Sequence, residues 1–325
     1  MDILFLGTSS GKPTKTRNVS GLALIEEKGS AWYLIDCGEG TQHQLLHASL
    51  SLHELQAIFI THVHGDHCYG LPGLLANAGM NGRKIPLNII APRGIETWFQ
   101  VTQTQTQLHL PFEVHFLETE ALLNRKFGNM LVSAIELSHR VPSFAYSFTE
   151  HDVEASLDTE KLLLNEIPQG PLWGKLKKGI DVSHDGKTIK SSEYLIANSK
   201  PRKIVIGGDN DRPDLLKEAC ENCNVLVHEA TFTADIAKKV GDGAGHSYAG
   251  LTASFAEEIS IPNLVLTHFS PRYQSNTETS PSIKDIQNEA SGVFGGKLII
   301  AEDFARYRLK KTGELISVEA HSFSA

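Results

Sequence analysis

The sequence has few cysteines and no long apolar run, and the pattern of its first residues is not typical of a targeting segment. Its 325 residues include 4 cysteines, which are too few and too scattered for a disulfide framework. No uninterrupted apolar stretch approaches the roughly 20 residues that a membrane helix needs. The first residues, Met1 to Leu6, lack the basic and apolar regions of a signal peptide. We therefore expect a cytoplasmic protein without a membrane segment.

Positive charge is also scarce. The chain carries 30 Lys and Arg against 38 Asp and Glu, for a formal net charge of −8. This balance argues against a protein coated with positive charge for nucleic acid, so RNA binding would have to use local patches. The two candidate patches are Lys12, Lys15 and Arg17 in an early loop, and Lys175, Lys177 and Lys178 later in the chain. The overall charge is equally compatible with a small anionic ester as substrate.

Histidine, by contrast, is concentrated in one short segment. Residues 61–67 read Thr-His-Val-His-Gly-Asp-His and follow the apolar run Ala57 to Ile60. Because side chains alternate along an extended segment, His62 and His64 point to the same side and both can reach one cation. Gly65 then lets the backbone turn, so that the Asp-His pair at the end of the segment adds two further ligands. Nitrogen and oxygen ligands at this density favour zinc, with manganese or iron as alternatives.

Two cations need more ligands than this segment offers. His139, Asp209 and His268 each follow a short apolar run and are candidates for the missing positions. A carboxylate can bridge two cations, so we expect a two-metal centre bridged by Asp209. Its two ligand sets are His62, His64 and His139 for one cation, and Asp66, His67 and His268 for the other.

These residues resemble the signature of the metallo-β-lactamase superfamily, and further motifs are similar to those of the ribonuclease Z family within it. The similar motifs are Phe-Leu-Gly-Thr at 5–8, Pro-Thr-Lys-Thr-Arg-Asn at 13–18, Asp-Cys-Gly-Glu-Gly-Thr-Gln at 36–42, Gly-Leu-Pro-Gly-Leu-Leu at 70–75, Ser-His-Arg-Val-Pro at 138–142, His-Glu-Ala-Thr at 228–231 and Leu-Thr-His-Phe-Ser at 266–270. The resemblance spans almost the whole chain. It implies a zinc-dependent endoribonuclease, with two Zn²⁺ per subunit, that removes 3′ trailers from precursor transfer RNA by phosphodiester hydrolysis.

One block separates this family from its relatives. Gly-Pro-Leu-Trp-Gly-Lys-Leu-Lys-Lys-Gly at 170–179 resembles the tip of the protruding arm with which ribonuclease Z grips transfer RNA. We expect the arm to span roughly residues 150–192. Gly and Pro break regular structure, the lysines offer ammonium groups to phosphates, and Trp173 is available for stacking. The resemblance also implies that the loop at 13–18, with Lys15 and Arg17, senses the 3′ end of the transfer RNA.

The resemblance implies catalytic roles as well. Asp66 would orient or deprotonate the attacking water. His246, held by Glu229, would protonate the departing ribose 3′-oxygen as the general acid. Independently of the resemblance, Asp36 either orients a ligand histidine through a hydrogen bond or, as an Asp before Cys-Gly, serves the turn.

Two positions depart from the family pattern. Gly-Asp-Thr is replaced by Gly-Asp-Asn at 208–210, and His-Ser-Thr is replaced by His-Ser-Tyr at 246–248. The expected ligand Asp209 and the expected acid His246 survive both changes, so the reaction class is kept. The properties open to change are the orientation of the bridging carboxylate, the shape of the pocket near His246, and hence efficiency and substrate preference.

Short β-rich runs alternate with helical patterns in both halves of the chain. The expected strands are 2–6, 22–26, 32–36, 57–60, 87–90, 203–206, 224–227, 263–266 and 297–301, and the expected helices are 41–47, 71–78, 213–219, 251–259 and 283–290. Two β-rich halves with outer helices fit the αββα sandwich of the metallo-β-lactamase type that the resemblance implies. We expect a single α/β domain over residues 1–325 into which the arm is inserted.

Two other functions stay open. The acidic charge and the two departures favour a metallo-β-lactamase-fold phosphodiesterase that acts on small phosphodiesters. A catalytically silent RNA-binding relative is disfavoured, because competent residues occupy all the ligand positions. The resemblance also implies a homodimer, in which the arm of one subunit serves the active site of the other.

Overall fold

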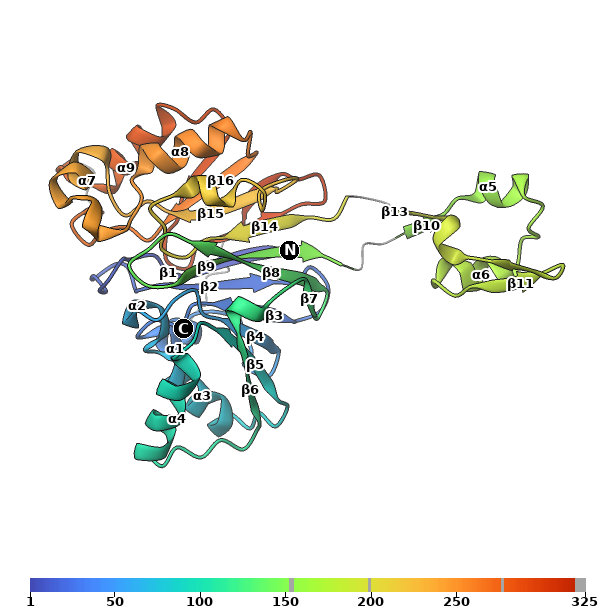
Figure 1. The fold of residues 1–325 in the computed structure, drawn as a ribbon, viewed down its shortest axis with the longest axis horizontal. Coiled ribbons are helices and arrows are strands. Elements are labelled where there is room, and N and C mark those ends of the chain that lie inside the picture. The colour runs from blue at the N-terminus through green and yellow to red at the C-terminus, as the bar shows by residue number, and fades with distance from the viewer. Residues whose placement is uncertain (152–154, 198–199, 276–277, 319–325) are drawn as a thin grey trace. The chain divides into compact units, whose positions relative to one another are not determined.

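The computed structural model describes residues 1–151, 155–197, 200–275 and 278–318 (Figure 1). The chain divides into two compact units. The main unit comprises Met1–Thr149 and Arg202–Ala325, and the inserted unit comprises Glu150–Pro201. Each unit has apolar clusters of its own.

The first sheet of the main unit contains the six strands nearest the N-terminus and the two nearest the C-terminus among the described residues. Among the described residues it has eight strands in the order β19-β18-β1-β2-β3-β4-β5-β6. Their bounds are β1 Asp2–Gly7, β2 Gly21–Ile25, β3 Trp32–Ile35, β4 Leu55–Phe59, β5 Leu87–Ala91, β6 Val114–Glu118, β18 Arg306–Leu309 and β19 Leu315–Val318. Strands β3 to β6 pair in parallel. Parallel strands are covered on both faces, which explains the nearly continuous apolar sequences of β3, β4 and β5.

The second sheet contains strands that lie between these two sets in the sequence. In the described part of the chain it has seven strands in the order β17-β16-β15-β14-β9-β8-β7. Their bounds are β7 Arg125–Phe127, β8 Met130–Leu137, β9 Ser143–Glu150, β14 Lys203–Ile206, β15 Val225–Glu229, β16 Asn263–Thr267 and β17 Lys297–Ile300. Strands β14 to β17 are parallel, so their carboxyl ends meet at one edge of the sheet. Ligands in open α/β sheets bind at such an edge.

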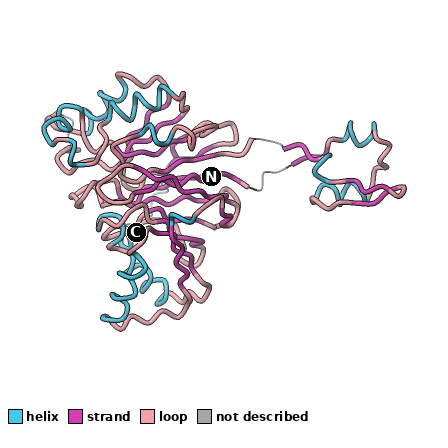
Figure 2. The backbone as a smooth tube through the Cα atoms, viewed as in Figure 1, coloured by secondary structure: helices cyan, strands magenta, loops and turns pink. Residues whose placement is uncertain are grey.

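Helices cover the outer faces of the two sheets (Figure 2). Their bounds are α1 Thr41–Leu46, α2 Gly65–Cys68, α3 Leu71–Met80 and α4 Ile95–Gln105 beside the first sheet, and α7 Ala234–Val240, α8 Ala249–Glu258 and α9 Ile283–Ser291 beside the second. One core joins the two sheets, with Phe59 packed against Phe148 at 5.1 Å between ring centroids. A second core lies between the first sheet and its helices, and a third lies between the second sheet and its helices. The predicted αββα sandwich is therefore confirmed.

Most of the expected elements of the main unit form within one or two residues of their expected bounds. The helix expected at 213–219 is wrong, because only Pro213–Leu216 forms a short 3₁₀ helix. Leu216 is its buried apolar anchor, and so short a segment gains too little packing to support an α-helix. Strands β18 and β19 were not expected. In β18 the charged Arg306 and Arg308 alternate with Tyr307 and Leu309, and both arginines pair with the buried Asp2 of β1.

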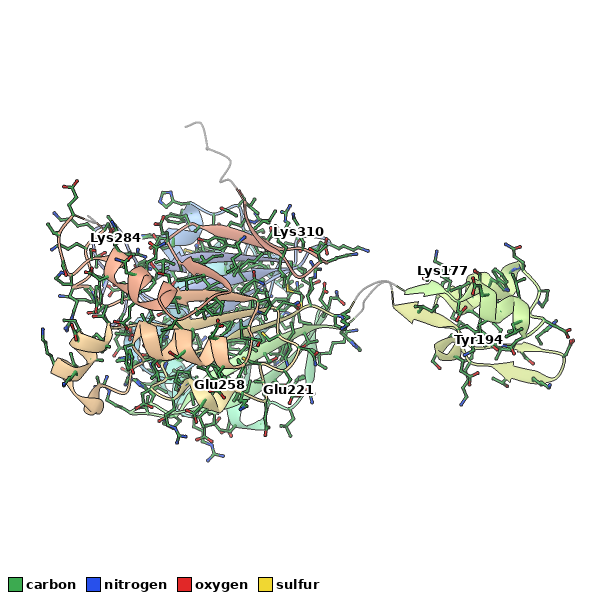
Figure 3. The ribbon with its side chains drawn as sticks, turned by 90° about the horizontal axis from the view of Figure 1, so that it is seen from above. Lys177, Tyr194, Glu221, Glu258, Lys284 and Lys310 are labelled. Carbon is green, nitrogen blue, oxygen red and sulfur yellow. The ribbon has the colours of Figure 1, made fainter. Side chains whose placement is uncertain are left out.

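The inserted unit has its own small core. Its elements are β10 Ala155–Leu157, α5 Thr159–Leu164, α6 Pro171–Lys177, β11 Val182–His184, β12 Lys187–Ile189 and β13 Leu195–Ala197, with a 3₁₀ helix at Ser191–Glu193. Strand β10 pairs with β13 and β11 pairs with β12, both antiparallel. The apolar cluster consists of Leu162, Ile167, Leu176, Val182 and Tyr194. Figure 3 marks Tyr194 and the exposed Lys177 in this unit.

No helix within the described residues combines the length and the apolar character that crossing a membrane requires. The cysteines Cys37, Cys68, Cys220 and Cys223 are buried free thiols.

Candidate metal centre

The histidine-rich segment leaves the first sheet directly after β4. His64 is the residue before α2 and is extended, with φ −66° and ψ 148°. Its Nδ1 lies 3.1 Å from Nε2 of His62, so the two rings reach one point, as their alternation along the chain predicts. A Cβ atom at Gly65 would lie 2.1 Å from the ring of Tyr69. A larger residue at the position where the backbone turns into the helix would therefore have to displace the exposed ring of Tyr69.

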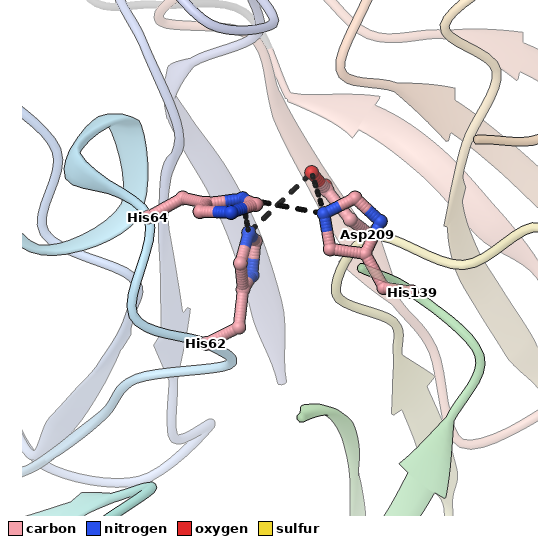
Figure 4. Close-up of side chains that lie close together, drawn as sticks. All are labelled: His62, His64, His139 and Asp209. Atoms are coloured by element: carbon pink, nitrogen blue, oxygen red, sulfur yellow. Dashed lines mark hydrogen bonds and ion pairs between the residues drawn. The ribbon is translucent and has the colours of Figure 1, made fainter. Parts of the chain in front are cut away.

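His139 and Asp209 join this pair from the second sheet. They follow strands β8 and β14. His139 Nε2 lies 3.2 Å from His64 Nδ1, and Asp209 Oδ2 lies 3.5 Å from His62 Nε2 and 3.8 Å from His139 Nε2. Figure 4 shows the four side chains pointing toward one another. Together they form a first group of ligand atoms around one position.

A second group forms on the other side of Asp209. It contains Asp66, His67 and His268. The Nε2 atoms of His67 and His268 are 3.3 Å apart, and Asp66 Oδ2 is 3.5 Å from each. Asp209 Oδ1 lies 3.5 Å from His67 Nε2 and 3.3 Å from His268 Nε2. Asp209 thus presents one carboxylate oxygen to each group.

The spacing of these atoms fits metal ions. Tetrahedral ligands at a Zn–N distance of about 2.0–2.1 Å are separated from one another by about 3.3 Å. The three closest nitrogen pairs, at 3.1, 3.2 and 3.3 Å, match this separation. Asp209 Oδ1 is buried without a hydrogen-bond partner, an arrangement that is costly unless a positive charge balances it. The cluster is a metal-binding His/Asp site consistent with two metal ions.

The pKa shifts of the three histidines in the first group favour metal binding as well. Burial is the main cause that lowers the pKa of His64 and His139, and it holds the pKa of His62 well below its usual value. Neutral imidazole is the form that binds a metal. Burial also lowers the pKa of His67, but neighbouring carboxylates, with Asp36 the strongest, raise it well above the usual value. This concentration of negative charge around His67 favours a cation at that position.

Ring nitrogens that face away from the two groups are hydrogen-bonded. The pairs are His62 Nδ1 with Thr61 Oγ1 at 3.1 Å, His67 Nδ1 with Asp36 Oδ2 at 2.7 Å, His139 Nδ1 with the carbonyl of Gly245 at 2.6 Å and His268 Nδ1 with Thr231 Oγ1 at 3.0 Å. Each bond leaves the Nε2 lone pair of that histidine directed at the metal positions. Asp36 was expected in this role from the sequence. The Gly245 carbonyl was missed, because a backbone acceptor has no side-chain signal.

His246 and Glu229 lie beside the two groups. His246 Nδ1 is 3.0 Å from Glu229 Oε1 and 3.7 Å from Asp209 Oδ2. Burial lowers the pKa of His246, but the Glu229 carboxylate outweighs burial and raises this pKa to about 9. The Glu229 carboxylate is itself fixed, because it accepts hydrogen bonds from the Thr231 hydroxyl and from the Asn210 N–H. The imidazole is therefore positioned and protonated at neutral pH.

The departure at Asn210 is accommodated by hydrogen bonds. Asn210 Oδ1 accepts from the N–H groups of Ser138 and Arg212, at 3.2 and 3.1 Å. Its Nδ2 lies 3.0 Å from Nε2 of the buried His228. An amide can make all of these bonds at once, so Asn210 ties together segments that carry Asp209, His139 and Glu229. The second departure, Tyr248, lines a cavity beside His246.

The residue before the early loop, Gly11, hydrogen-bonds to the site. The N–H of Gly11 donates to Asp66 Oδ2 at 2.7 Å. Lys15 is exposed, whereas Arg17 is only 8% exposed. The Nη1 atom of Arg17 donates to Thr8 Oγ1 at 2.7 Å and to the carbonyl of Ala301 at 2.8 Å. A contact of Arg17 with RNA stays a prediction.

The other expected RNA-binding residues lie on the inserted unit. Lys175, Lys177 and Lys178, called the arm lysines below, are exposed on α6 or directly after it. Trp173 is half-buried, and its Nε1 donates to the carbonyl of Ile167 at 3.1 Å. The indole therefore helps to hold α6 in this unit, and its stacking on RNA stays a prediction.

The chain is similar to known proteins over nearly its whole length. Residues 1–167 match the family model described as Anti-Pycsar protein Apyc1. The chain is 51% identical to ribonuclease Z of Pseudomonas putida (strain W619), a match that covers 96% of this chain and 98% of that protein. It is 39% identical to ribonuclease Z of Bacillus subtilis (strain 168), over 94% of this chain and 97% of that protein. Among solved structures, human tRNase Z, short form (ELAC1), has a TM-score of 0.65 at 27% identity, with 95% of this chain and 100% of that chain covered.

Proposed function

The chain belongs to the ribonuclease Z family of the metallo-β-lactamase superfamily, and on this premise we propose that it removes 3′ trailers from precursor transfer RNA at a two-zinc centre. Through residues 1–167 it belongs also to the family described as Anti-Pycsar protein Apyc1. The ribonuclease Z relatives cover nearly the whole chain and therefore guide the assignment of activity. The observation that carries the proposal is Asp209, whose two oxygens face two separate groups of ligand atoms.

The two groups would each hold one zinc ion. The first ion would bind His62, His64, His139 and Asp209 Oδ2, and the second would bind Asp66, His67, His268 and Asp209 Oδ1. Manganese and iron suit the same nitrogen and oxygen donors. When bound, the two cations supply a water of lowered pKa and positive charge that neutralises the phosphate oxygens.

The chain's own residues would move the protons. Asp66 would orient the attacking water or take its proton, and the hydrogen bond from Gly11 N–H holds its carboxylate in place. His246 would donate a proton to the departing ribose 3′-oxygen. Its Nδ1 is engaged by Glu229, so Nε2 is the nitrogen that would face the substrate. Glu229 would keep the imidazole protonated until the transfer.

Local positive patches would bind the RNA despite the net charge of −8. The arm lysines would contact phosphates, because they are exposed and clustered on one short helix or directly after it. Lys15 would contact the RNA near the cut. Arg17 would hold the early loop in place through its bonds to Thr8 and Ala301. The cytoplasmic location and the homodimer with shared arms stay predictions from the sequence.

Cleavage of a precursor transfer RNA with a 3′ trailer tests the proposal. The metal-loaded protein would be compared with His64→Ala, with a variant lacking residues 172–178, and with His43→Ala as a control for an exposed histidine. A small phosphodiester would serve as the second substrate. We expect trailer removal to need both the metal ligands and residues 172–178, and hydrolysis of the small diester to need the metal ligands alone. Hydrolysis of the small diester without any trailer removal would instead support the phosphodiesterase alternative.

A further inference from the structure

Asn210 follows the expected bridging ligand Asp209 in the chain and is completely buried. Its backbone contacts the two segments that carry the expected general acid and its partner. The N–H of Asn210 donates to Glu229 Oε1 at 2.8 Å, and its carbonyl accepts from the Ser247 hydroxyl at 2.6 Å. Ser247 follows His246 directly, and Glu229 Oε1 is also the atom that lies 3.0 Å from His246 Nδ1. The backbone of Asn210 therefore links the bridging carboxylate to the expected general acid.

The side chain of Asn210 is held through both atoms of its amide. Oδ1 accepts from the N–H groups of Ser138 and Arg212, and Nδ2 lies 3.0 Å from His228 Nε2. Burial lowers the pKa of His228, which keeps its ring neutral. His228 Nδ1 lies 2.8 Å from the carbonyl oxygen of Glu229. Because a carbonyl only accepts, Nδ1 carries the ring proton, and Nε2 is left to accept from the Asn210 amide.

Threonine, the usual family residue at this position, cannot make the same set of bonds. An amide has its acceptor and its N–H donors on two different atoms. The hydroxyl of threonine is one atom with one proton, and it lies one bond closer to the backbone. A threonine at position 210 would therefore leave His228 Nε2 or one of the two backbone N–H groups without its partner. A buried polar group without a partner is costly, so the backbone at 210 would move to recover the lost bond.

Resting on the proposed function, we infer that Asn210 is a positioning residue that fixes the imidazole of His246 relative to the carboxylate of Asp209. It acts on the imidazole through Glu229 Oε1 and through Ser247. His228 holds the Asn210 amide in the orientation that this role needs. The departure from Gly-Asp-Thr is then required for the reaction rate of this chain.

A displaced general acid slows only those substrates whose leaving oxygen must be protonated. The ribose 3′-oxygen is a poor leaving group and needs the proton of His246, whereas a nitrophenolate leaves without one. Loss of the positioning should therefore slow hydrolysis of a dinucleoside phosphate that releases a ribose 3′-oxygen, and it should spare a nitrophenyl phosphodiester. Loss of metal or of folded protein would slow both.

The ratio of the two hydrolysis rates tests the inference, with metal in excess and the bound metal measured. We expect Asn210→Thr to lower kcat for the dinucleoside phosphate about tenfold and Asn210→Ala up to about 100-fold, with KM unchanged. Asn263→Thr is the matched control, because Asn263 is buried and its Nδ2 donates to the carbonyls of Asn224 and Gly313 at 2.7 and 3.1 Å. This control should lower Tm and keep the parent's ratio of rates.

Two exchanges at His228 separate hydrogen bonding from packing. His228→Gln keeps an oxygen that can accept from the Asn210 amide, and it should keep the parent's ratio of rates. His228→Leu fills similar space without an acceptor and should behave as Asn210→Thr does.

NMR of the metal-free protein gives a readout without turnover. The Nδ1 proton of His246, which is bonded to Glu229, should give a downfield resonance that is protected from exchange with water. We expect this protection to be lost in Asn210→Thr and kept in Asn263→Thr.

Equal slowing of both small substrates in Asn210→Thr, or slowing of neither, would overturn the inference, and so would an unchanged His246 resonance. Selective slowing of the dinucleoside phosphate, in a protein that removes no trailer, would refute the proposed function and keep the positioning role. If the parent hydrolyses neither small substrate, the His246 resonance alone decides between the two outcomes.

Discussion

Replacement of Asp36 by Asn should weaken the second metal group, which contains His67, more than the first, which Asp36 reaches only through Thr61 and His62. Asp36 is buried and accepts three hydrogen bonds with its two oxygens. Oδ2 accepts from His67 Nδ1 at 2.7 Å and from the Thr61 hydroxyl at 3.0 Å, and Oδ1 accepts from the Thr61 N–H at 2.8 Å. Asn has the same shape and tolerates the positive φ of 59° found at this position. The change therefore alters hydrogen bonding and removes one negative charge, but it keeps the shape of the side chain.

The expected size of the effect follows from the loss of one acceptor. An amide can accept on one side only, so its NH₂ group must face either the His67 ring N–H or the Thr61 N–H, both of which are donors. Loss of such an orienting partner lowers metal affinity by about 10–100-fold. In the metal-free protein, one buried donor left without its acceptor should reduce the free energy of unfolding by about 1–3 kcal/mol.

Metal titration against a competing chelator would measure this effect. The parent should show two binding steps, and Asp36→Asn should shift the step that belongs to the group with His67 more than the other step. Asp235→Asn, at an exposed position of α7, controls for the loss of one negative charge. Two unchanged steps in Asp36→Asn would refute the argument that Asp36 orients His67 for metal binding.

Three further predictions concern catalysis, RNA binding and stability. The general-acid role predicts that cleavage declines as the pH rises above about 9. Burial lowers the pKa of His246, but Glu229 raises this pKa to about 9. A pH–rate profile of Glu229→Gln should therefore show the decline at lower pH, and an unchanged profile would contradict the pairing of His246 with Glu229. Alanine at all three arm lysines should reduce the slope of log affinity for precursor transfer RNA against log salt concentration by up to about 3. A charge-matched triple replacement of exposed lysines on the main unit, outside the early loop, should keep the parent's slope. For Asp2, burial raises the pKa, but hydrogen bonds and charge from Arg308 and Arg306 lower it below the usual 3.8, so its stabilisation is present at neutral pH and is lost as the pH falls through the lowered value. Asp2→Asn should therefore lower the free energy of unfolding at pH 7 by about 1–2 kcal/mol, since the arginines are partly exposed, and urea unfolding near pH 3 should show a smaller difference.

The sequence alone determined the local part of the metal centre and the layered fold. Apolar runs such as 57–60 and 203–206 identify strands that are buried on both faces, and the period of two makes His62 and His64 reach one point. These features depend on neighbours in the chain, which is why pattern and propensity are sufficient for them. The motifs also identified the family.

Only the tertiary structure decided how distant residues meet. Parallel pairing of β14, β15 and β16 brings Asp209 and His268 to one edge, and the exact approach of Asp209 to two groups depends on that register. The Gly245 carbonyl that orients His139, and the salt bridges that allow the charged strand β18, come from segments far apart in sequence. Arg17 looked like a free cation in a loop, yet the loop folds back and buries it. Contacts of this kind depend on long-range packing, and no local pattern encodes them.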